Sequence, residues 1–130
     1  MVAAIVGAGL STPADAAGQG ERQALLAAAR PLAERDLGLP VKFLVHRLNR
    51  VGEWALLDAE MQDGHGRPVD LDRSRLADLA EGGMVSAGFV ALLRQHGGKW
   101  TVVAHDTGAT DEGYLEWRKT YGAPAAVFAR

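Results

Sequence analysis

Four segments of the chain have the composition of β-strands, and each carries apolar side chains on both of its alternating faces. The segments are residues 41–49, 54–61, 85–94 and 99–105. In the second segment Leu56 and Leu57 point to opposite faces, and in the fourth Val102 and Val103 do the same. A sheet covered on one side only would be polar on its other face. The pattern therefore predicts a sheet that is covered on both faces, or a sheet with one face that binds a partner.

Turn signals between these segments predict an antiparallel meander. Residues 50–53 separate the first two strands, and Gly97–Gly98 is a typical hairpin connection between the last two. The longer polar connection, residues 62–83, contains a charged stretch over 72–81 that we expect to form a short surface helix. Gly88 falls inside the third strand and predicts a bend or a bulge there. The four strands are therefore expected to pair in sequence order.

A helix before the first strand is expected to cover one face of this sheet. Residues 23–37 have the spacing of an amphipathic helix. Its predicted apolar stripe consists of Leu25, Ala28, Ala29 and Leu32. Pro31 lacks an amide proton, so we expect it to kink this helix or to divide it in two.

Residues 111–121 predict a second helix, which is expected to cover the other face. Thr110 or Asp111 is the expected N-cap, and Gly122 followed by Pro124 ends the helix. The alternative use of this helix start is an anion site. Three aromatic side chains lie along one side of the helix: Tyr114, Trp117 and Tyr121. We expect them to pack against the sheet; the alternative is an aromatic wall that faces a ligand.

The first sixteen residues have the features of a secretory signal peptide. Residues 2–10 form an uncharged apolar run, and Ala14-Asp15-Ala16 places small residues at the positions that a signal peptidase reads. We therefore expect a signal peptide over 1–16, a single α+β domain over 17–130, and a periplasmic or secreted bacterial protein. No lysine or arginine precedes the apolar run, and the alternative is a short N-terminal strand or helix of the folded domain.

Length and composition exclude several classes of protein. A chain of 130 residues fits one domain of the common size, and a net charge of −2 gives no broad positive surface for nucleic acid. No run of about eighteen apolar residues is present, so we expect no membrane-spanning helix. The absence of cysteine excludes disulfides, thiolate metal ligands and a cysteine nucleophile.

The titratable side chains provide no complete catalytic or metal-binding set. His46 and His105 lie on predicted strands, and no third metal ligand has a suitable spacing, so we predict no metal and no cofactor. The best acid–base group is His105 beside Asp106, with Asp111 nearby. Neighbouring residues of a strand point to opposite faces, so His105 and Asp106 are not expected to pair with each other.

A helix followed by a four-stranded antiparallel meander resembles the cystatin-like class of folds, which includes the NTF2-like domains. The run Lys99–Val103, after a Gly-Gly turn, is similar to the last hairpin of many such domains. Residues 108–111, Trp117 and residues 121–124 resemble the end of small exported proteins of Gram-negative bacteria. The resemblance spans roughly residues 21–128. It implies a fold shared by protease inhibitors, binding modules and pocketed isomerases or dehydratases, and so it selects no activity.

These observations lead to three functional hypotheses. The first is a non-catalytic module that binds a periplasmic protein or a small apolar ligand. The second is an enzyme or carrier with an NTF2-like pocket between the sheet and the C-terminal helix, in which Asp58 and Glu60 form a carboxylate pair. The third is a dimer whose sheets pack together. The candidate ligand-binding residues are Trp54, Asp58, Glu60, Trp100, His105, Tyr114 and Trp117. An enclosed pocket lined by apolar groups and one of these carboxylates would favour the second hypothesis. A filled core with an exposed apolar strip would favour the first, and a stable dimer through the open sheet face would favour the third.

Overall fold

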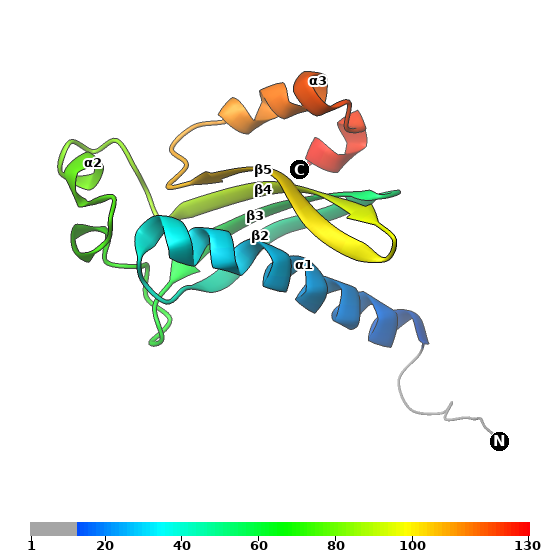
Figure 1. Cartoon of the computed structure of the whole chain (residues 1–130), viewed down its shortest axis with the longest axis horizontal. Coiled ribbons are helices and arrows are strands. Elements are labelled where there is room, and N and C mark those ends of the chain that lie inside the picture. Colours follow the sequence, from blue (N-terminus) through cyan, green and yellow to red (C-terminus); the bar gives the residue numbers. More distant parts are fainter. Residues whose placement is uncertain (1–12) are drawn as a thin grey trace.

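The computed structural model describes residues 13–130, and side chains from residue 18 onward. It begins with a long helix, α1 (Pro13–Leu37), and continues with four strands (Figure 1). The strands are β2 (Lys42–Val51), β3 (Trp54–Gln62), β4 (Gly88–His96) and β5 (Lys99–Thr107). Of the predicted signal peptide, residues 1–12 lie outside the described part of the chain, and residues 13–16 form the first turn of α1. No helix within the described part is both long and apolar enough to cross a membrane.

The sheet is the predicted meander. Its strand order is β2-β3-β4-β5, and all neighbouring strands are antiparallel. Gly97 and Gly98 connect β4 to β5, and both have positive φ angles, as a type I′ hairpin turn requires. β2 and β5 are therefore the two edges of the sheet, and β3 and β4 lie between them.

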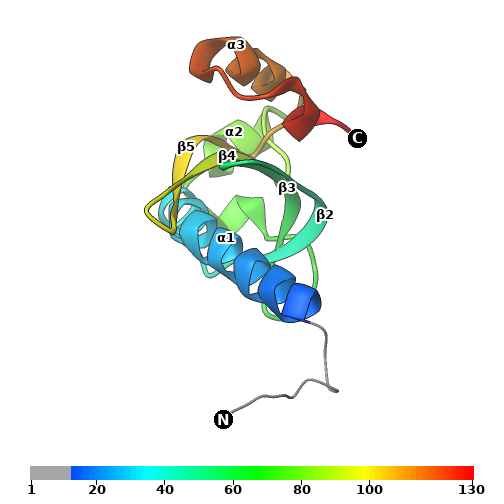
Figure 2. The same ribbon diagram turned by 90° about the vertical axis from the view of Figure 1, so that its right-hand side faces the viewer.

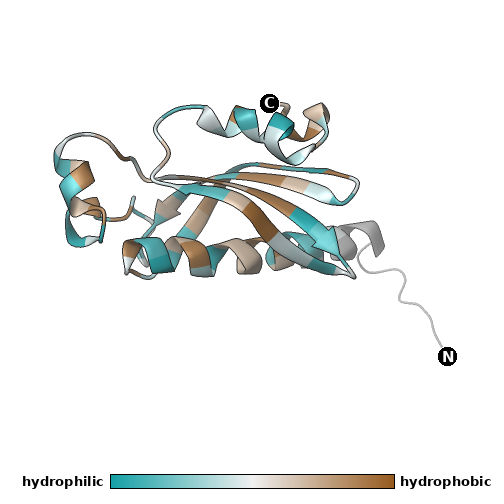
Figure 3. Cartoon of the chain, turned by 45° about the horizontal axis from the view of Figure 1, so that its top comes forward, coloured by the Kyte–Doolittle hydropathy of each residue, from teal (hydrophilic) through white to brown (hydrophobic). Residues whose placement is uncertain are grey.

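Each face of the sheet has its own cover, so the prediction from the doubly apolar strands is confirmed. α1 lies across one face, and the C-terminal segment (residues 113–130) lies across the other (Figure 2). The two buried clusters alternate along β3: Leu56 belongs to the cluster under the C-terminal segment, and Leu57 belongs to the cluster under α1. Figure 3 shows these hydrophobic stretches of the strands between the two covers.

α1 continues through Pro31, and the expected division of the helix does not occur. Pro31 and Ala27 are both exposed, so the Ala27 carbonyl that loses its amide partner faces water. The buried stripe also differs from the prediction. It repeats every four residues, as Leu25, Ala29, Ala33 and Leu37, while Ala28 and Leu32 are only half-buried at its side.

Two β-bulges change which face some side chains occupy. His46 is the extra residue in the β2–β3 pairing, and Val103 is the extra residue in the β4–β5 pairing. Because a bulge shifts the alternation by one residue, Leu48 joins the cluster under α1 rather than lying opposite Phe43. For the same reason His105 faces α1, on the side of Trp100, and not the opposite side as simple alternation predicts.

The remaining helices are shorter than predicted. Residues 72–81 are occupied by a 3-10 turn, η1 (Leu71–Arg73), and one turn of helix, α2 (Ala77–Glu81). The C-terminal segment begins with a 3-10 turn, η2 (Gly113–Glu116), continues as α3 (Trp117–Tyr121) and ends with η3 (Ala125–Phe128). The Asp111 carboxylate accepts the Gly113 amide at 2.9 Å, and a glycine in the first turn weakens an α-helix. Gly122 ends α3 in the left-handed conformation, as predicted.

Gly88 is the first residue of β4 rather than a bend inside the strand. A Cβ atom at this position would lie 2.9 Å from the Ala109 carbonyl oxygen. The glycine therefore permits a close approach between the start of β4 and the chain that leaves β5. The irregularity in this hairpin lies further along, between Leu92 and Leu93.

Candidate functional site

The structure divides the predicted ligand-binding residues between the two faces of the sheet. Trp54, Tyr114 and Trp117 belong to the cluster under the C-terminal segment, and Asp58 and Glu60 are on the same face by strand alternation. Trp100 and His105 lie on the other face, toward α1. The sheet separates the two groups, so these residues do not form one site.

The space between the sheet and the C-terminal segment is filled by side chains. Tyr114 packs against Trp117 and Phe128, with ring centroids 6.3 and 6.5 Å apart. The buried residues of this cluster are Trp54, Leu56, Val90, Leu92, Tyr114, Ala123, Val127 and Phe128. The aromatic side chains of the C-terminal segment therefore pack against the sheet, as expected, in the place where the second hypothesis put a pocket.

Asp58 takes part in the attachment of the C-terminal segment. Arg47, whose side chain is only 10% exposed, donates to the Asp58 carboxylate at 3.3 Å and to the Tyr114 hydroxyl at 2.9 Å. Its other terminal nitrogen donates to the carbonyl of Phe128 at 3.2 Å. Glu60 accepts a separate hydrogen bond from the Gln62 amide at 2.9 Å. The two carboxylates therefore have different partners and do not pair with each other.

Asp58 also lines two small hollows, of about 240 and 270 Å³, together with Arg130. The charged groups in the first hollow are paired within the protein. Glu112 forms an ion pair with Arg130, and the Asp111 carboxylate holds the Gly113 amide. The Glu112–Arg130 pair joins the start of the C-terminal segment to its end, and the Asp111 hydrogen bond is local. The sequence favoured Thr110 or Asp111 as an N-cap over an anion site; the N-cap residue of η2 is Glu112, and Asp111 instead accepts the Gly113 amide.

His105 has an acidic partner that the sequence did not indicate. Its Nε2 lies 2.9 Å from the Asp36 carboxylate of α1, and Thr107 donates to the same carboxylate oxygen at 2.7 Å. Burial alone would raise the pKa of Asp36, but the hydrogen bonds from Thr107 and His105 outweigh it and hold that pKa below 3.8. Neither His105 nor Thr107 lines any of the hollows described in this section. These three residues connect the end of α1 to β5 by hydrogen bonds.

The other predicted polar groups remain separate. His46 lies on β2 and His105 on β5, the two opposite edges of the sheet, so the two histidines do not meet. Burial and the nearby Asp111 carboxylate raise the pKa of Asp106. Among the described residues, no group of three or more histidine, aspartate or glutamate side chains is placed to hold a metal ion.

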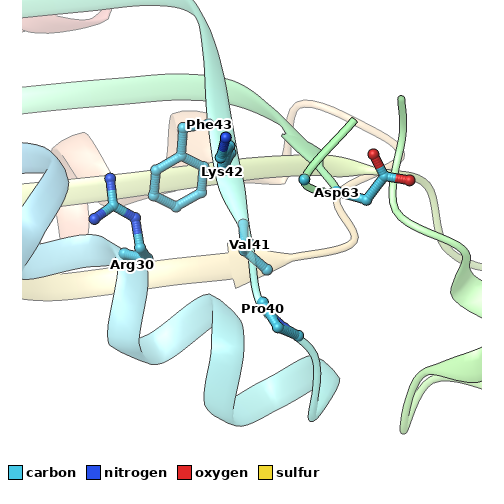
Figure 4. A pocket seen from close by; sticks show the side chains of 7 residues that line it. Arg30, Pro40, Val41, Lys42, Phe43 and Asp63 are labelled. Atoms are coloured by element: carbon cyan, nitrogen blue, oxygen red, sulfur yellow. The ribbon is translucent and has the colours of Figure 1, made fainter. Parts of the chain in front are cut away.

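The largest hollow described here is an open groove of about 540 Å³ between α1 and the start of β2 (Figure 4). Residues 40–43 form its floor, with the side chains of Pro40, Val41 and Phe43 as its apolar part. Arg30 extends from α1 at one side, the Phe43 ring lies between Arg30 and Lys42 of β2, and Asp63 lies on the other side of β2 (Figure 4). A second hollow of about 200 Å³ begins at Pro40 and Asp63 and continues to Val69 and Arg73.

The groove holds two cations that form no ion pair with the residues that the structure describes. Within the described part of the chain, no carboxylate lies within 4.0 Å of the charged nitrogens of Arg30 or Lys42. Asp63 is different, because its carboxylate accepts the backbone amides of Arg67 at 3.1 Å and His65 at 2.8 Å. These two hydrogen bonds lower the pKa of Asp63, so the carboxylate stays ionised and fixed in place at neutral pH.

None of the groove residues was among the sites predicted from the sequence. The groove arises where α1 packs beside an edge strand, and no local motif reports that contact. Its lining contains no histidine, serine or threonine, and its one carboxylate is held by two amides. The charged side chains of the groove can therefore bind an ionic ligand, and its lining contains no nucleophile paired with a general base.

Comparison with known protein families, with curated proteins and with solved structures finds no match to this chain. The site is therefore interpreted from its own geometry.

Proposed function

We propose that this protein is a non-catalytic binding module that docks an extended segment of another protein along the first half of β2. The observation that carries the proposal is the free edge of Lys42–Val45, which lies directly beside the groove. An extended segment that pairs with such an edge gains main-chain hydrogen bonds, and the neighbouring hollows select its side chains.

The two halves of β2 differ in how their outer edge is covered. In the second half, Asn49 donates to the carbonyl of Val127 at 2.9 Å, and Arg47 donates to Phe128, so the C-terminal segment lies against the strand. In the first half, no other strand of the described chain pairs with the outer edge. The bulge at His46 separates the two halves. An uncovered edge of this kind is a template for pairing with another chain.

Side chains on both faces of this edge also support a docked strand. Phe43 is half-buried toward α1, where its ring lies 4.9 Å from that of Phe89. Leu44 points to the opposite face and is 45% exposed. An added strand would contact Phe43 with one side chain and Leu44 with the next.

A second copy of this chain is the alternative occupant of the same edge. A symmetric dimer brings the same surface patch of each subunit together. The patch carries Arg30, Lys42 and Asp63, so charges of both signs meet in such a dimer, and a stable dimer in sedimentation that is lost in Leu44→Asp would favour this alternative. The faces of the sheet are unsuitable for a dimer, because both are covered by the chain itself.

The proposal can be tested by nuclear magnetic resonance titration of the labelled protein with a capped peptide of about eight alternating valine and threonine residues. We expect the amide signals of residues 42–45 to shift, and those of the β5 edge to stay unchanged. Leu44→Asp places a charge on the docking edge and should weaken binding at least tenfold. Leu115→Asp is the matched control, because Leu115 is 44% exposed on the C-terminal segment, and it should bind as the parent does. The proposal would be contradicted if the amide signals of residues 42–45 did not shift. It would also be contradicted if Leu44→Asp and Leu115→Asp lost peptide affinity equally.

We further propose that the fold belongs to the cystatin-like class, which includes the NTF2-like domains, and that the protein is exported to the periplasm or the medium of a Gram-negative bacterium. One helix across a curved antiparallel meander supports the first statement. The apolar run and the Ala14-Asp15-Ala16 sequence support the second. Cleavage after Ala16 would remove only the first turn of α1. Mass spectrometry of exported material should find a chain that starts at Ala17, and exported protein with an intact Met1 would contradict cleavage.

A further inference from the structure

We infer that the docked segment forms main-chain hydrogen bonds with Phe43 and Val45 and places an aromatic side chain opposite Phe43, against the Phe43 ring and Arg30. The inference rests on the proposed function, and it adds the register in which the segment binds and the residue type by which it is selected. It is drawn from the backbone hydrogen bonds of β3 and from the α1 side of the groove.

The hydrogen bonds of β3 show in which direction its backbone groups point. The Met61 amide donates to the carbonyl of Ala87 at 2.7 Å, and the Met61 carbonyl accepts the Val69 amide at 3.0 Å. Both backbone groups of Met61 therefore point away from β2. Because the backbone groups of a strand alternate in direction, the residues on either side of Met61, Glu60 and Gln62, bond to β2.

The register of β2 then identifies the backbone groups at its outer edge. Leu44 and Lys42 lie opposite Glu60 and Gln62, so these two residues of β2 bond to β3. Phe43 and Val45 alternate with them, so their amide and carbonyl groups point outward. β2 is an edge strand, and no other strand of the described chain pairs with these groups.

Contacts within the protein close this edge at both ends. Before it, the outward amide of Val41 is bonded to the Glu34 carboxylate at 3.0 Å. After it, His46 is the extra residue of the bulge, and the C-terminal segment lies against the second half of β2. A docked strand therefore forms its hydrogen bonds with Phe43 and Val45.

The α1 side of this edge favours an aromatic side chain opposite Phe43. In an antiparallel pair, which is more stable per residue than a parallel one, a residue directly opposite Phe43 points to the same face of the sheet. On that face the half-buried Phe43 ring lines the groove, and Arg30 of α1 lies beside the ring (Figure 4). An aromatic ring of the partner placed there would pack against Phe43 and lie beside the Arg30 guanidinium.

The two cations of the groove differ in their access to this position. Arg30 is on the α1 side, and within the described residues it forms no ion pair and lies over no aromatic ring. Lys42 is next to Phe43 in β2, so its side chain points to the opposite face of the sheet. A ring opposite Phe43 would therefore contact Arg30 and not Lys42.

The affinity test uses three capped peptides of alternating valine and threonine that differ at one central position. This position holds phenylalanine, cyclohexylalanine or valine; cyclohexylalanine has nearly the size of phenylalanine but no π-electrons. Each peptide is titrated into the parent protein, into Arg30→Gln and into Lys42→Gln. Lys42→Gln is the matched control, because both variants remove one exposed cation that lines the groove, on opposite faces of β2.

We expect the phenylalanine peptide to bind about fivefold more tightly than the other two. This preference over cyclohexylalanine should fall to about twofold or less in Arg30→Gln and stay unchanged in Lys42→Gln. Equal binding of the three peptides, or an equal fall of the preference in both variants, would overturn the aromatic residue.

Hydrogen exchange of the backbone amides tests the register. The Phe43 and Val45 amides should exchange about tenfold or more slowly once the phenylalanine peptide is bound, whereas the Lys42 and Leu44 amides should be protected with and without the peptide. New protection at Lys42 and Leu44 instead would overturn the register. In each of these negative cases, peptide binding that is lost in Leu44→Asp would leave the proposed function standing, whereas a failure of all three peptides to bind would remove both.

Discussion

Asp36, at the end of α1, receives hydrogen bonds from two side chains of β5. Thr107 and His105 both reach the same carboxylate oxygen, and α1 is thereby fixed in position along the strand. Apolar packing alone sets this position poorly, because alanines make up much of the buried stripe of α1. The directional hydrogen bonds at the end of α1 therefore fix the position of the helix along β5.

Replacing Asp36 with alanine should lower the free energy of unfolding by about 1–2 kcal/mol at neutral pH. Because the pKa of Asp36 is below 3.8 in the folded state, this contribution is fully present above about pH 4. It is lost as the pH falls through the lower, folded-state pKa. The difference between the parent and Asp36→Ala, measured by urea denaturation from pH 7 to pH 2, should therefore shrink on acidification.

The control for this measurement is Asp78→Ala, since Asp78 is exposed in α2 and forms no hydrogen bond or ion pair with its side chain in the described chain. A stability loss in Asp36→Ala that is the same at pH 7 and pH 2 would show that the carboxylate acts through packing alone. An equal loss of unfolding free energy in Asp78→Ala would show that removing any surface negative charge has this effect.

At the level of elements, the strands were predicted more accurately than the helices. Both hairpins follow from local turn residues, and β3 begins and ends within one residue of the predicted 54–61. The helix over 111–121 is divided because the Asp111 carboxylate and Gly113 favour a different first turn, a choice that side-chain periodicity does not report. The bulges at His46 and Val103 were also missed, since a bulge depends on how two strands pair.

The candidate site was missed for a related reason. Arg30 lies on an exposed part of α1, and Asp63 lies in a turn after β3, so each has the features of an ordinary surface residue. They line one groove only because α1 packs beside the start of β2. The sequence pointed instead to aromatic and acidic residues such as Tyr114 and Asp58, which the structure uses to attach the C-terminal segment.

For the whole molecule, the important property is that one sheet supplies both cores. Along β3 and β4, neighbouring residues belong alternately to the cluster under α1 and to the cluster under the C-terminal segment. Leu92 and Leu93 are adjacent in the chain, fully buried, and on opposite faces. Because the same strands contribute to both cores, unfolding of the sheet disrupts both cores at once. The two covers should therefore unfold together.

The chain contains three tryptophans, and their positions allow this coupling to be measured. Trp100 reports on the face under α1, whereas Trp54 and Trp117 report on the face under the C-terminal segment. With fluorinated tryptophan, all three folded signals should disappear at one denaturant concentration. Leu56→Ala and Leu57→Ala are matched neighbours on opposite faces, both fully buried, and each should lower the free energy of unfolding by about 2–5 kcal/mol. Each variant should also shift all three signals together. If Leu56→Ala instead releases Trp54 and Trp117 while Trp100 stays folded, the C-terminal segment is an independent unit, and the packed core beneath it is a cleft that this segment closes.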